Sequence, residues 1–401
     1  MSAATAMPTE ADQELTDRFY GEVDDAMRRD GPFEFARSDE FFRTSRAAIA
    51  CDVDWSELHR VVARITGFES WYSAWAASGE RFAGLAQAAA DAGRSTTAAE
   101  HYLRASMLFH FAQLFTRPED PQRAEGRRLR VRYFRAACPD LSPPIEQVGI
   151  PAGDLELPGY LRRPPGEGPR PALLMLPGAN SVKEELHHWA AAITRRGVTT
   201  LALDGPGQGE LSPATGGPPL RFETYTASVE PAVDWLCAHD DVDGGRVGAW
   251  GQSTGGQLAI RLAAEVPALA AVISVSGAYD FRRELSELTP ADVREEARDL
   301  HGFDSFEAAA EYVAAQGSLD GVVSRVDVPL LLVHGARDEL VDDAEVDRIA
   351  QEAGGSVTVL RYPKGNHGVT NFNLEMTASM ADWAAETLAL GRDRAAAGPS
   401  L

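Results

Sequence analysis

The spacing of apolar residues changes once along the chain. Through the first third of the sequence, apolar side chains recur three and four positions apart, which is typical of amphipathic helices. After the adjacent prolines Pro143 and Pro144, short unbroken apolar runs take their place. This change predicts an all-helical domain over residues 1–140, followed by a second domain over residues 141–401.

The first part of the chain carries recognisable helix starts. Residues 14–29 have an apolar stripe at helical spacing. Asp54 precedes another stripe and has Glu57 three positions later, so it is expected to cap a helix. Thr97 and Glu100 repeat this pattern, which predicts a further helix that starts at Thr97. We expect these stripes to pack in the core of the domain rather than against a cofactor.

The second part of the chain alternates apolar strands with helices. The expected strands are residues 145–150, 155–162, 171–176, 198–203, 247–250, 270–275, 330–333 and 357–362. Helices are expected at 223–237 and 254–264. Unbroken apolar strands separated by helices predict an α/β fold whose mostly parallel sheet has helices on both faces. Residues 280–325 interrupt the alternation and are interpreted as an insertion over the strand ends.

The overall charge limits the partners of the protein. The 401 residues include 38 Lys and Arg against 60 Asp and Glu, which gives a formal net charge of −22. Such an excess of acid opposes binding to nucleic acid or to an anionic membrane surface. The one basic stretch, residues 127–135, is interpreted as a solvated helix face that balances neighbouring acids. We expect neither a nucleic-acid partner nor a membrane partner.

Cysteine usage and apolar run length bear on localisation. Cys51, Cys138 and Cys237 are widely spaced and odd in number, which suggests neither a disulfide framework nor a zinc site. The start of the chain lacks the apolar run of a signal peptide, and no stretch approaches the ~20 apolar residues that span a membrane. We therefore expect a cytoplasmic protein.

The strongest chemical signal is the sequence Gly-Gln-Ser-Thr-Gly at residues 251–255. It follows an expected strand and precedes an expected helix, which is the setting of a nucleophile elbow. In such a turn the serine hydroxyl stands clear above the sheet, because the neighbouring glycines leave room for a sharp corner. Ser253 is therefore the predicted nucleophile, and an ordinary glycine-rich turn is the alternative.

A serine nucleophile needs a base, and the base needs an orienting group. The order expected for this topology is serine, acid and histidine. Asp338 follows the strand at 330–333 and His367 follows the strand at 357–362, so both should reach the sheet edge that carries Ser253.

Neighbouring acids offer alternatives to Asp338. Glu339, Asp342 or Asp343 could orient the histidine instead. Asp338 would then merely cap the helix that follows.

Acyl chemistry also needs donors for the oxyanion. One donor is expected to be the backbone N–H of Thr254, directly after the nucleophile. The other should come from the loop after the third strand, where Ala179 is the first candidate and Asn180 the second.

The remaining motifs indicate no cofactor. The glycine-rich residues 204–209 lack the lysine of a P-loop and the spacing of a dinucleotide fingerprint, so we interpret them as a tight turn beside the site. His187 and His188 are expected on an exposed helix face, and no histidines and carboxylates have the spacing of metal ligands. We expect a small-molecule substrate and neither a metal nor a cofactor.

These motifs resemble those of α/β-hydrolase-fold serine hydrolases that have an N-terminal helical domain. Within that group the chain is similar to the 2,6-dihydroxypseudooxynicotine hydrolase branch, which is related to the fermentation-respiration switch proteins and the fungal polyketide-shortening hydrolases. The resemblance is carried by residues 176–185, 204–210, 251–255, 334–338 and 365–367.

The resemblance implies an α/β-hydrolase domain whose active site is capped by the helical domain. In some members of the branch it also implies hydrolysis of a carbon–carbon bond in a β-dicarbonyl-type substrate. Such a reaction leaves a carbanion that must be protonated, and Glu284 is a candidate for the auxiliary acid. An acidic surface residue of the insertion is the alternative role for Glu284.

The expected function is hydrolysis, through an acyl-enzyme on Ser253, of an ester or of a carbon–carbon bond of an activated ketone in a small metabolite. An acyltransferase or cyclase of natural-product biosynthesis would use the same triad but exclude water. A binding protein could also retain the fold without the chemistry. A homodimer formed through the helical domain is a further open alternative.

Overall fold

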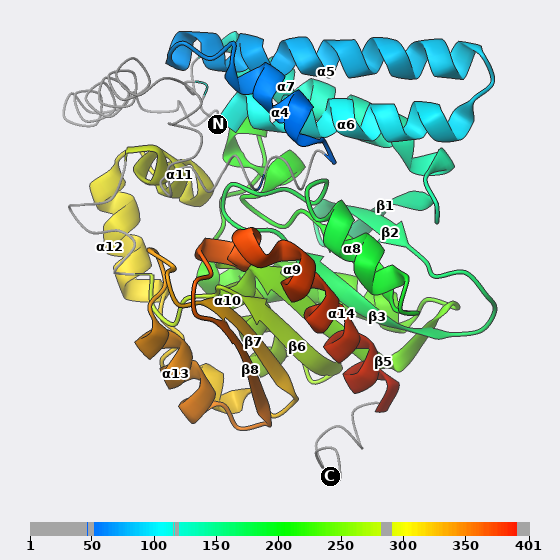
Figure 1. The fold of residues 1–401 in the computed structure, drawn as a ribbon. Helices are drawn as coiled ribbons and strands as arrows, with labels where there is room; N and C mark the ends of the chain where they lie inside the picture. Colours follow the sequence, from blue (N-terminus) through cyan, green and yellow to red (C-terminus); the bar gives the residue numbers. More distant parts are fainter. Residues whose placement is uncertain (1–45, 47–51, 115, 117–119, 282–290, 391–401) are drawn as a thin grey trace. The chain divides into compact units, whose positions relative to one another are not determined.

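The computed structural model describes residues 46, 52–114, 116, 120–281 and 291–390, drawn in colour in Figure 1. Contacts along the chain separate two compact units. The first, which we call the helical unit, ends at Gln147, and the second, the sheet unit, begins at Val148. The helix expected at residues 14–29 lies outside the described residues.

The described part of the helical unit is built from four α-helices and one short 3₁₀ helix. They are α4 (Trp55–Val62), α5 (Phe68–Asp91), α6 (Ser95–Leu114), α7 (Pro121–Ala137) and η2 (Cys138–Asp140). Apolar side chains of these helices form the core, but α6 has no single apolar stripe, because all its residues from 105 to 113 are buried. The indole of Trp71 is buried there and donates from Nε1 to the carbonyl of Phe111 over 2.9 Å. The basic stretch lies on α7, where Arg128 is exposed but Arg130 is buried.

One predicted helix start is confirmed and the other is wrong. The Asp54 carboxylate accepts from the backbone N–H of Glu57 over 2.8 Å and caps α4. Helix α6, however, begins at Ser95, two residues before Thr97. Gly93 ends α5 in the left-handed region with φ 74°, and its N–H and that of the next residue bond back to the last turn. Because the chain turns within three residues after α5, α6 can begin at Ser95.

Glu57 holds α4 against α5 through Arg81 and also pairs with Arg60 of its own helix. Its side chain is 4% exposed and accepts hydrogen bonds from Arg60, over 3.0 Å, and from Arg81. Burial, the largest influence, raises the pKa of Glu57, but the two guanidinium groups outweigh it and lower the pKa to about 2.

Glu57→Gln is expected to destabilise the protein by ~2 kcal/mol at pH 7, because glutamine cannot carry the charge that the arginines bind. A carboxylate whose folded pKa is lowered stabilises the fold above its unfolded pKa, and this contribution is lost between about pH 4.5 and about pH 2. Urea unfolding should therefore show the difference between wild type and variant shrink below pH 4.5. Glu125→Gln, at an exposed ion pair with Arg128, is the matched control and should change little. An equal loss for Glu57→Gln at pH 7 and pH 3 would contradict this account.

The described residues form one eight-stranded sheet in the order β1-β2-β4-β3-β5-β6-β7-β8, in which the first three residues of β1 still belong to the helical unit. The strands are β1 (Ile145–Ala152), β2 (Leu155–Arg162), β3 (Arg170–Leu176), β4 (Thr199–Leu203), β5 (Val242–Gln252), β6 (Leu269–Val275), β7 (Leu330–Gly335) and β8 (Val357–Tyr362). Strand β2 pairs antiparallel with β4, and the pairs from β4 to β8 are all parallel. The expected mostly parallel sheet is confirmed.

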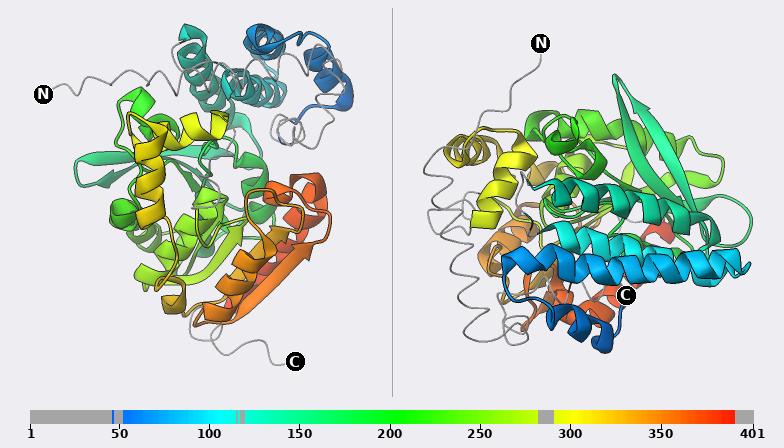
Figure 2. Two further views of the ribbon diagram at one scale, coloured as in Figure 1. Left: turned by 90° about the vertical axis from the view of Figure 1, so that its left-hand side faces the viewer. Right: turned by 90° about the horizontal axis from the view of Figure 1, so that it is seen from above.

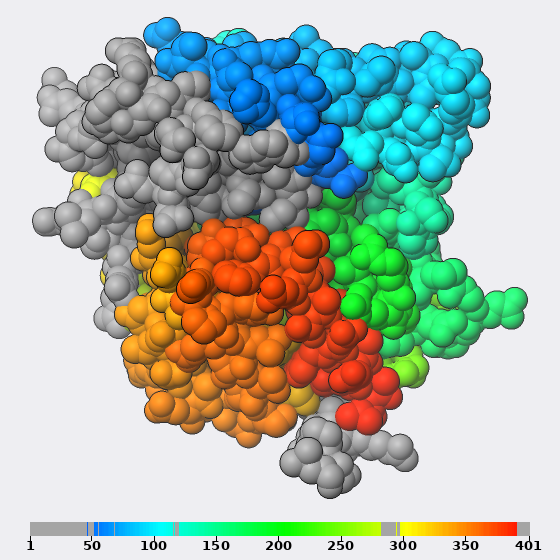
Figure 3. Space-filling view, viewed as in Figure 1, coloured from blue at the N-terminus to red at the C-terminus, as the bar shows by residue number. Residues whose placement is uncertain are grey.

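Helices cover both faces of this sheet. The described helices of the sheet unit are α8 (His187–Thr194), α9 (Phe222–Cys237), α10 (Thr254–Glu265), α11 (Ala291–His301), α12 (Phe306–Gln316), α13 (Asp343–Glu352) and α14 (Asn373–Leu390), of which all but α11 and α12 cover a face of the sheet. Helices α8 and α14 share one core cluster, while α9, α10 and α13 share another. Figure 2 shows these two groups on opposite sides of the strands. In Figure 3 the orange-to-red segment that ends in α14 forms a continuous surface.

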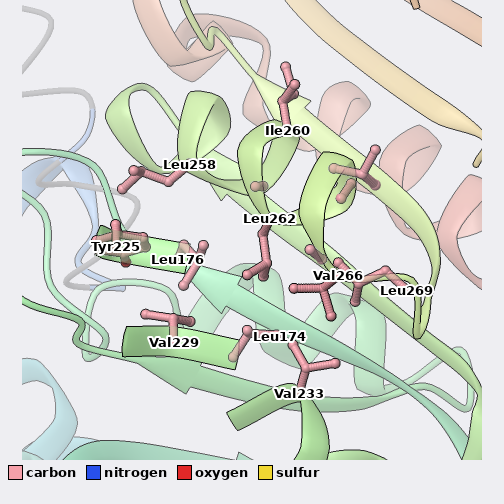
Figure 4. Packing of buried hydrophobic residues seen from close by; sticks show 14 of the residues in the cluster. Leu174, Leu176, Tyr225, Val229, Val233, Leu258, Ile260, Leu262, Val266 and Leu269 are labelled. Atoms are coloured by element: carbon pink, nitrogen blue, oxygen red, sulfur yellow. The ribbon is translucent and has the colours of Figure 1, made fainter. Parts of the chain in front are cut away.

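Strand β3 has apolar side chains on both faces of the sheet, so helices must pack on both. Leu174 and Leu176 point to the α9 and α10 side, where Figure 4 shows them beside Val229 and Leu258. The alternate residue Leu173 belongs to the cluster on the opposite face. A strand buried on both sides exposes only its ends, so polar side chains gather in the loops that follow the strands.

Helices α11 and α12 occupy the stretch between β6 and β7 that interrupts the alternation. They dock on the start of α9. The backbone N–H of Phe222 donates to the hydroxyl of Tyr312 over 2.7 Å, and the N–H of Leu220 donates to the carbonyl of Leu300 over 2.9 Å. Residues 282–290, which include the candidate acid Glu284, lie outside the described part of the chain.

Candidate active site

Ser253 lies at a sharp corner between β5 and α10. Its backbone is held at φ 55° and ψ −123°, a strained conformation for a residue with a side chain. The glycines on either side are required by close approach. A Cβ at Gly251 would collide with the carbonyl of Gly255, and a Cβ at Gly255 would collide with the carbonyl of Leu176. The predicted elbow therefore forms because only glycine fits beside the serine.

The serine hydroxyl meets a histidine from a distant loop. Ser253 Oγ lies 2.9 Å from Nε2 of His367, whose Nδ1 lies 2.9 Å from both carboxylate oxygens of Asp338. The three side chains come from the ends of β5, β7 and β8. The structure thus brings together the three residues that we expected to meet at one edge of the sheet.

Asp338 is fully buried and held as an acceptor. Its Oδ1 accepts from the backbone N–H groups of Leu340 and Val341, each over 3.0 Å. Burial, the largest influence, raises the pKa of Asp338, but His367 and these two N–H groups outweigh it and hold the pKa below its usual value. The carboxylate therefore stays ionised where it faces the imidazole.

Two of the alternative acids, Asp342 and Asp343, have other partners. Asp342 caps α13 by accepting from the N–H groups of Ala344 and Glu345. Asp343 pairs with Arg361 at the surface of the same helix. Asp338 is the acid that the structure places against His367.

The loop that carries His367 is fixed on both sides. The backbone N–H of Gly368 donates to Oγ of Ser276, directly after β6, over 2.9 Å. Asn366 donates from Nδ2 to the hydroxyl of Thr370 over 3.0 Å. Gly368 has φ 68°, and a Cβ there would collide with the side chain of Gln252. Sequence reasoning missed Ser276, whose only signal is its place directly after a strand beside the nucleophile.

One expected oxyanion donor, Thr254, directly follows the serine, and the loop that carries the other approaches it. Thr254 is the first residue of α10, so its N–H belongs to the turn that has no intrahelical acceptor. Gly178, which precedes Ala179, lies against the nucleophile: a Cβ built on it would stand 3.3 Å from Cβ of Ser253. This position favours Ala179 over Asn180, and the donor role of each remains a prediction.

His187 and His188 do not occupy an exposed helix face, and that expectation is wrong. His187 is buried, and the His188 ring is half-buried, 4.0 Å from the ring centroid of Trp189. Burial, followed by the neighbouring His187, lowers the pKa of His188 to about 3. Apolar Trp189 fixes the start of α8 in the core and draws both histidines inward.

The described residues also bear on metal ions and membranes. Within residues 46, 52–114, 116, 120–281 and 291–390, no three or more His, Cys, Asp or Glu side chains form a group that could hold a metal ion. None of the helices in those same ranges is both long and apolar enough to cross a membrane.

A parallel sheet covered on both faces, with a strained serine where β5 meets its helix, defines an α/β hydrolase. Two family profiles agree with this class. The X-Pro dipeptidyl-peptidase (S15 family) profile matches residues 154–290, and the prolyl oligopeptidase family profile matches residues 224–391.

Comparison with individual relatives shows which family of α/β hydrolases the chain belongs to. The 2,6-dihydropseudooxynicotine hydrolase of Paenarthrobacter nicotinovorans is 30% identical over 327 residues, which cover 80% of this chain and 86% of that enzyme. The chain belongs to the α/β-hydrolase family that includes this enzyme, and it is a hydrolase. The fold and the family resemblance predicted from the sequence are both confirmed.

The chain is also similar to a fungal hydrolase and to a hydrolase of known crystal structure. Hydrolase acrC of Aspergillus aculeatus is 33% identical over 276 residues, which cover 62% of this chain and 64% of that protein. The crystal structure of 2,6-dihydroxy-pseudo-oxynicotine hydrolase matches with a TM-score of 0.77 and 28% identity, covering 88% of this chain and 97% of the other. The likeness to that structure therefore extends well beyond the sheet.

Proposed function

We propose that this hydrolase works through an acyl-enzyme on Ser253. The observation that carries the proposal is the chain of contacts from Ser253 Oγ through His367 to Asp338, each 2.9 Å long. Serine at its ordinary pKa is a poor nucleophile, and a neutral imidazole within hydrogen-bond distance can take its proton during attack. The buried carboxylate of Asp338 then stabilises the imidazolium.

The reaction proceeds in two halves. Ser253 Oγ attacks the substrate carbonyl carbon as its proton passes to Nε2 of His367, and the N–H groups of Thr254 and Ala179 stabilise the oxyanion. Collapse expels the leaving group, which takes the proton from His367. A water molecule, deprotonated by His367, then attacks the acyl ester and releases the acid and free Ser253.

We further propose that the substrate is a small metabolite with an ester or an activated ketone of the β-dicarbonyl type. Support comes from the likeness to 2,6-dihydropseudooxynicotine hydrolase and to proteins named as fungal hydrolases. When a carbon–carbon bond breaks, the departing carbanion needs a proton. His367 can supply it, and Glu284 stays the candidate for a second acid. We propose no metal, nucleic-acid or membrane partner for this chemistry.

A fluorophosphonate probe tests covalent catalysis. Folded protein is expected to gain one phosphonyl group on the peptide that contains Ser253, and His367→Ala is expected to lose this labelling because the hydroxyl keeps its proton. Intact-mass and peptide mass spectrometry read the result. An unlabelled Ser253 in folded protein would support a binding protein in place of an enzyme.

Heavy-oxygen water separates hydrolysis from acyl transfer. With p-nitrophenyl acetate or benzoylacetone as substrate in ¹⁸O-water, hydrolysis should place one heavy oxygen in the released acid, because water attacks the acyl-enzyme. Products without the label would favour an acyltransferase or cyclase. Comparing the two probes also reports whether the site prefers the ester or the carbon–carbon bond.

A further inference from the structure

Two loops of the sheet unit meet beside the nucleophile. The β3 loop, residues 177–186, carries the proposed oxyanion donor Ala179. The β4 loop, residues 204–211, contains the glycine-rich residues 204–209 that the sequence assigned only to a tight turn. Strands β3 and β4 are parallel neighbours, so both loops leave the same edge of the sheet. The β4 loop contacts the β3 loop at two separate points.

The first contact is made by Gln208, which is fully buried. Its Nε2 donates to the carbonyl of Pro177 over 2.6 Å. Its Oε1 accepts from the hydroxyl of Tyr225 over 2.9 Å and from the N–H of Gly205 over 3.2 Å. Because the oxygen end of the amide is occupied by two donors, the nitrogen end has one orientation, toward Pro177.

The second contact is made by Asp204, also fully buried. Its Oδ1 accepts from the backbone N–H of Lys183 over 2.9 Å, and its Oδ2 accepts from Nζ of the same lysine over 2.7 Å. Lys183 Nζ also lies 3.0 Å from Glu184 and 2.7 Å from Glu210. A buried ammonium surrounded by carboxylates is held firmly, since each charge needs its partners away from water.

The two contacts bracket the proposed oxyanion donor. Pro177 and Lys183 lie on either side of Ala179 in the chain, and Gly178 packs on Ser253. An oxyanion donor works only when it is held within about 0.5 Å of its productive position. A loop fixed at one end would let the peptide between Gly178 and Ala179 rotate, whereas a loop fixed at both ends would not.

We propose that Gln208 is a positioning residue that, together with Asp204, fixes the β3 loop so that the N–H of Ala179 points at the oxyanion. Gln208 acts through the Pro177 carbonyl and touches no substrate. This inference rests on the function proposed above, because it assigns the oxyanion site of that same reaction. It gives the glycine-rich β4 loop a role in transition-state stabilisation.

The test is the rate at which a fluorophosphonate phosphonylates Ser253, since charge develops on the phosphoryl oxygen during attack. Gln208→Met keeps the size of the side chain and removes the donor to Pro177. Loss of a whole oxyanion donor costs ~10²–10³-fold, so a displaced one is expected to lower the maximal rate by ~10–100-fold. The half-saturating probe concentration should change less than about 2-fold, because ground-state binding is retained.

Gln257→Met is the matched control. Gln257 is another fully buried glutamine, placed on α10, and its Nε2 donates to the carbonyls of Ala278 and Gly317 instead of to the β3 loop. It should lose stability to a similar extent as Gln208→Met, and thermal unfolding measures both. Its maximal phosphonylation rate should stay within about 3-fold of wild type, because it does not orient Ala179.

Tyr225→Phe provides a second variant should Gln208→Met fail to fold. It removes the hydroxyl that orients the Gln208 amide and leaves an aromatic ring in the core. We expect a loss of ~2–5-fold in the maximal rate, and no added loss when the two substitutions are combined, because Tyr225 acts through Gln208.

Two results would overturn the inference. If wild-type Ser253 reacts with the probe but Gln208→Met or Tyr225→Phe reacts as fast, positioning by Gln208 is refuted while the proposed function stands. If wild-type Ser253 does not react at all, the proposed function fails, and the inference fails with it.

Discussion

Ser253→Ala is expected to lower turnover of p-nitrophenyl acetate by on the order of 10⁴–10⁶-fold. The substitution removes the atom that we propose forms the acyl-enzyme, while His367 and Asp338 keep their mutual contact. A residual rate above that of water is expected, because the proposed oxyanion donors Thr254 and Ala179 remain. Steady-state kinetics against the uncatalysed reaction measure both quantities.

Ser274→Ala is the matched control for this substitution. Ser274 is a buried serine on β6 and pairs with Gly251 across the sheet, close to the nucleophile in space. Its loss should change turnover less than about 3-fold, since it lies outside the contacts between Ser253, His367 and Asp338. Wild-type turnover by a folded, uncontaminated Ser253→Ala protein would exclude covalent catalysis by that serine.

The meeting of these three side chains could be predicted because each follows a strand of the same parallel sheet: β5 and β7 are buried, whereas β8 is a partly exposed edge strand. Parallel strands buried on both faces bring their carboxyl ends to one edge, so order along the chain translates into nearness in space. The glycines beside Ser253 carried a further signal, since a strained corner leaves no room for a Cβ. Sequence reasoning was therefore most successful where local pattern and topology pointed the same way.

Contacts that depend on a partner far along the chain could not be predicted. Lys183 stands in a run of three charged residues that is typical of a solvated helix start, yet its side chain is 1% exposed. Its burial depends on Asp204, which a separate strand delivers to the same place. The inward position of His187 likewise follows from the packing of Trp189 rather than from any feature of the histidine.

The predicted start of helix α6 was wrong for a related reason. Thr97 and Glu100 have the spacing of a capping box. The turn at Gly93, directly after the end of α5, nevertheless places the start of α6 at Ser95. The glycine closes one helix within two residues and leaves no linker for a cap. The predicted start of α6 was wrong because the glycine turn after α5 determines it, and the capping-box pattern at Thr97 does not.

Asp338→Asn is expected to reduce kcat by ~10⁴-fold while the fold is retained. Oδ1 of Asp338 already accepts from the N–H groups of Leu340 and Val341, so an asparagine would place its oxygen there and its amide nitrogen toward Nδ1 of His367. Two donors would then face each other, and His367 would shift its proton to Nε2. In that tautomer the ring cannot accept the proton of Ser253.

Asp342→Asn tests whether position or mere loss of charge matters. Asp342 lies four residues further along and caps α13, a role that asparagine fulfils as well as aspartate. Its kcat should therefore stay within about 3-fold of wild type, with little change in thermal unfolding. Comparable activity in the two variants would refute the assignment of Asp338 as the orienting acid. A large loss confined to Asp338→Asn, with slowed phosphonylation of Ser253, would show that the histidine tautomer governs attack.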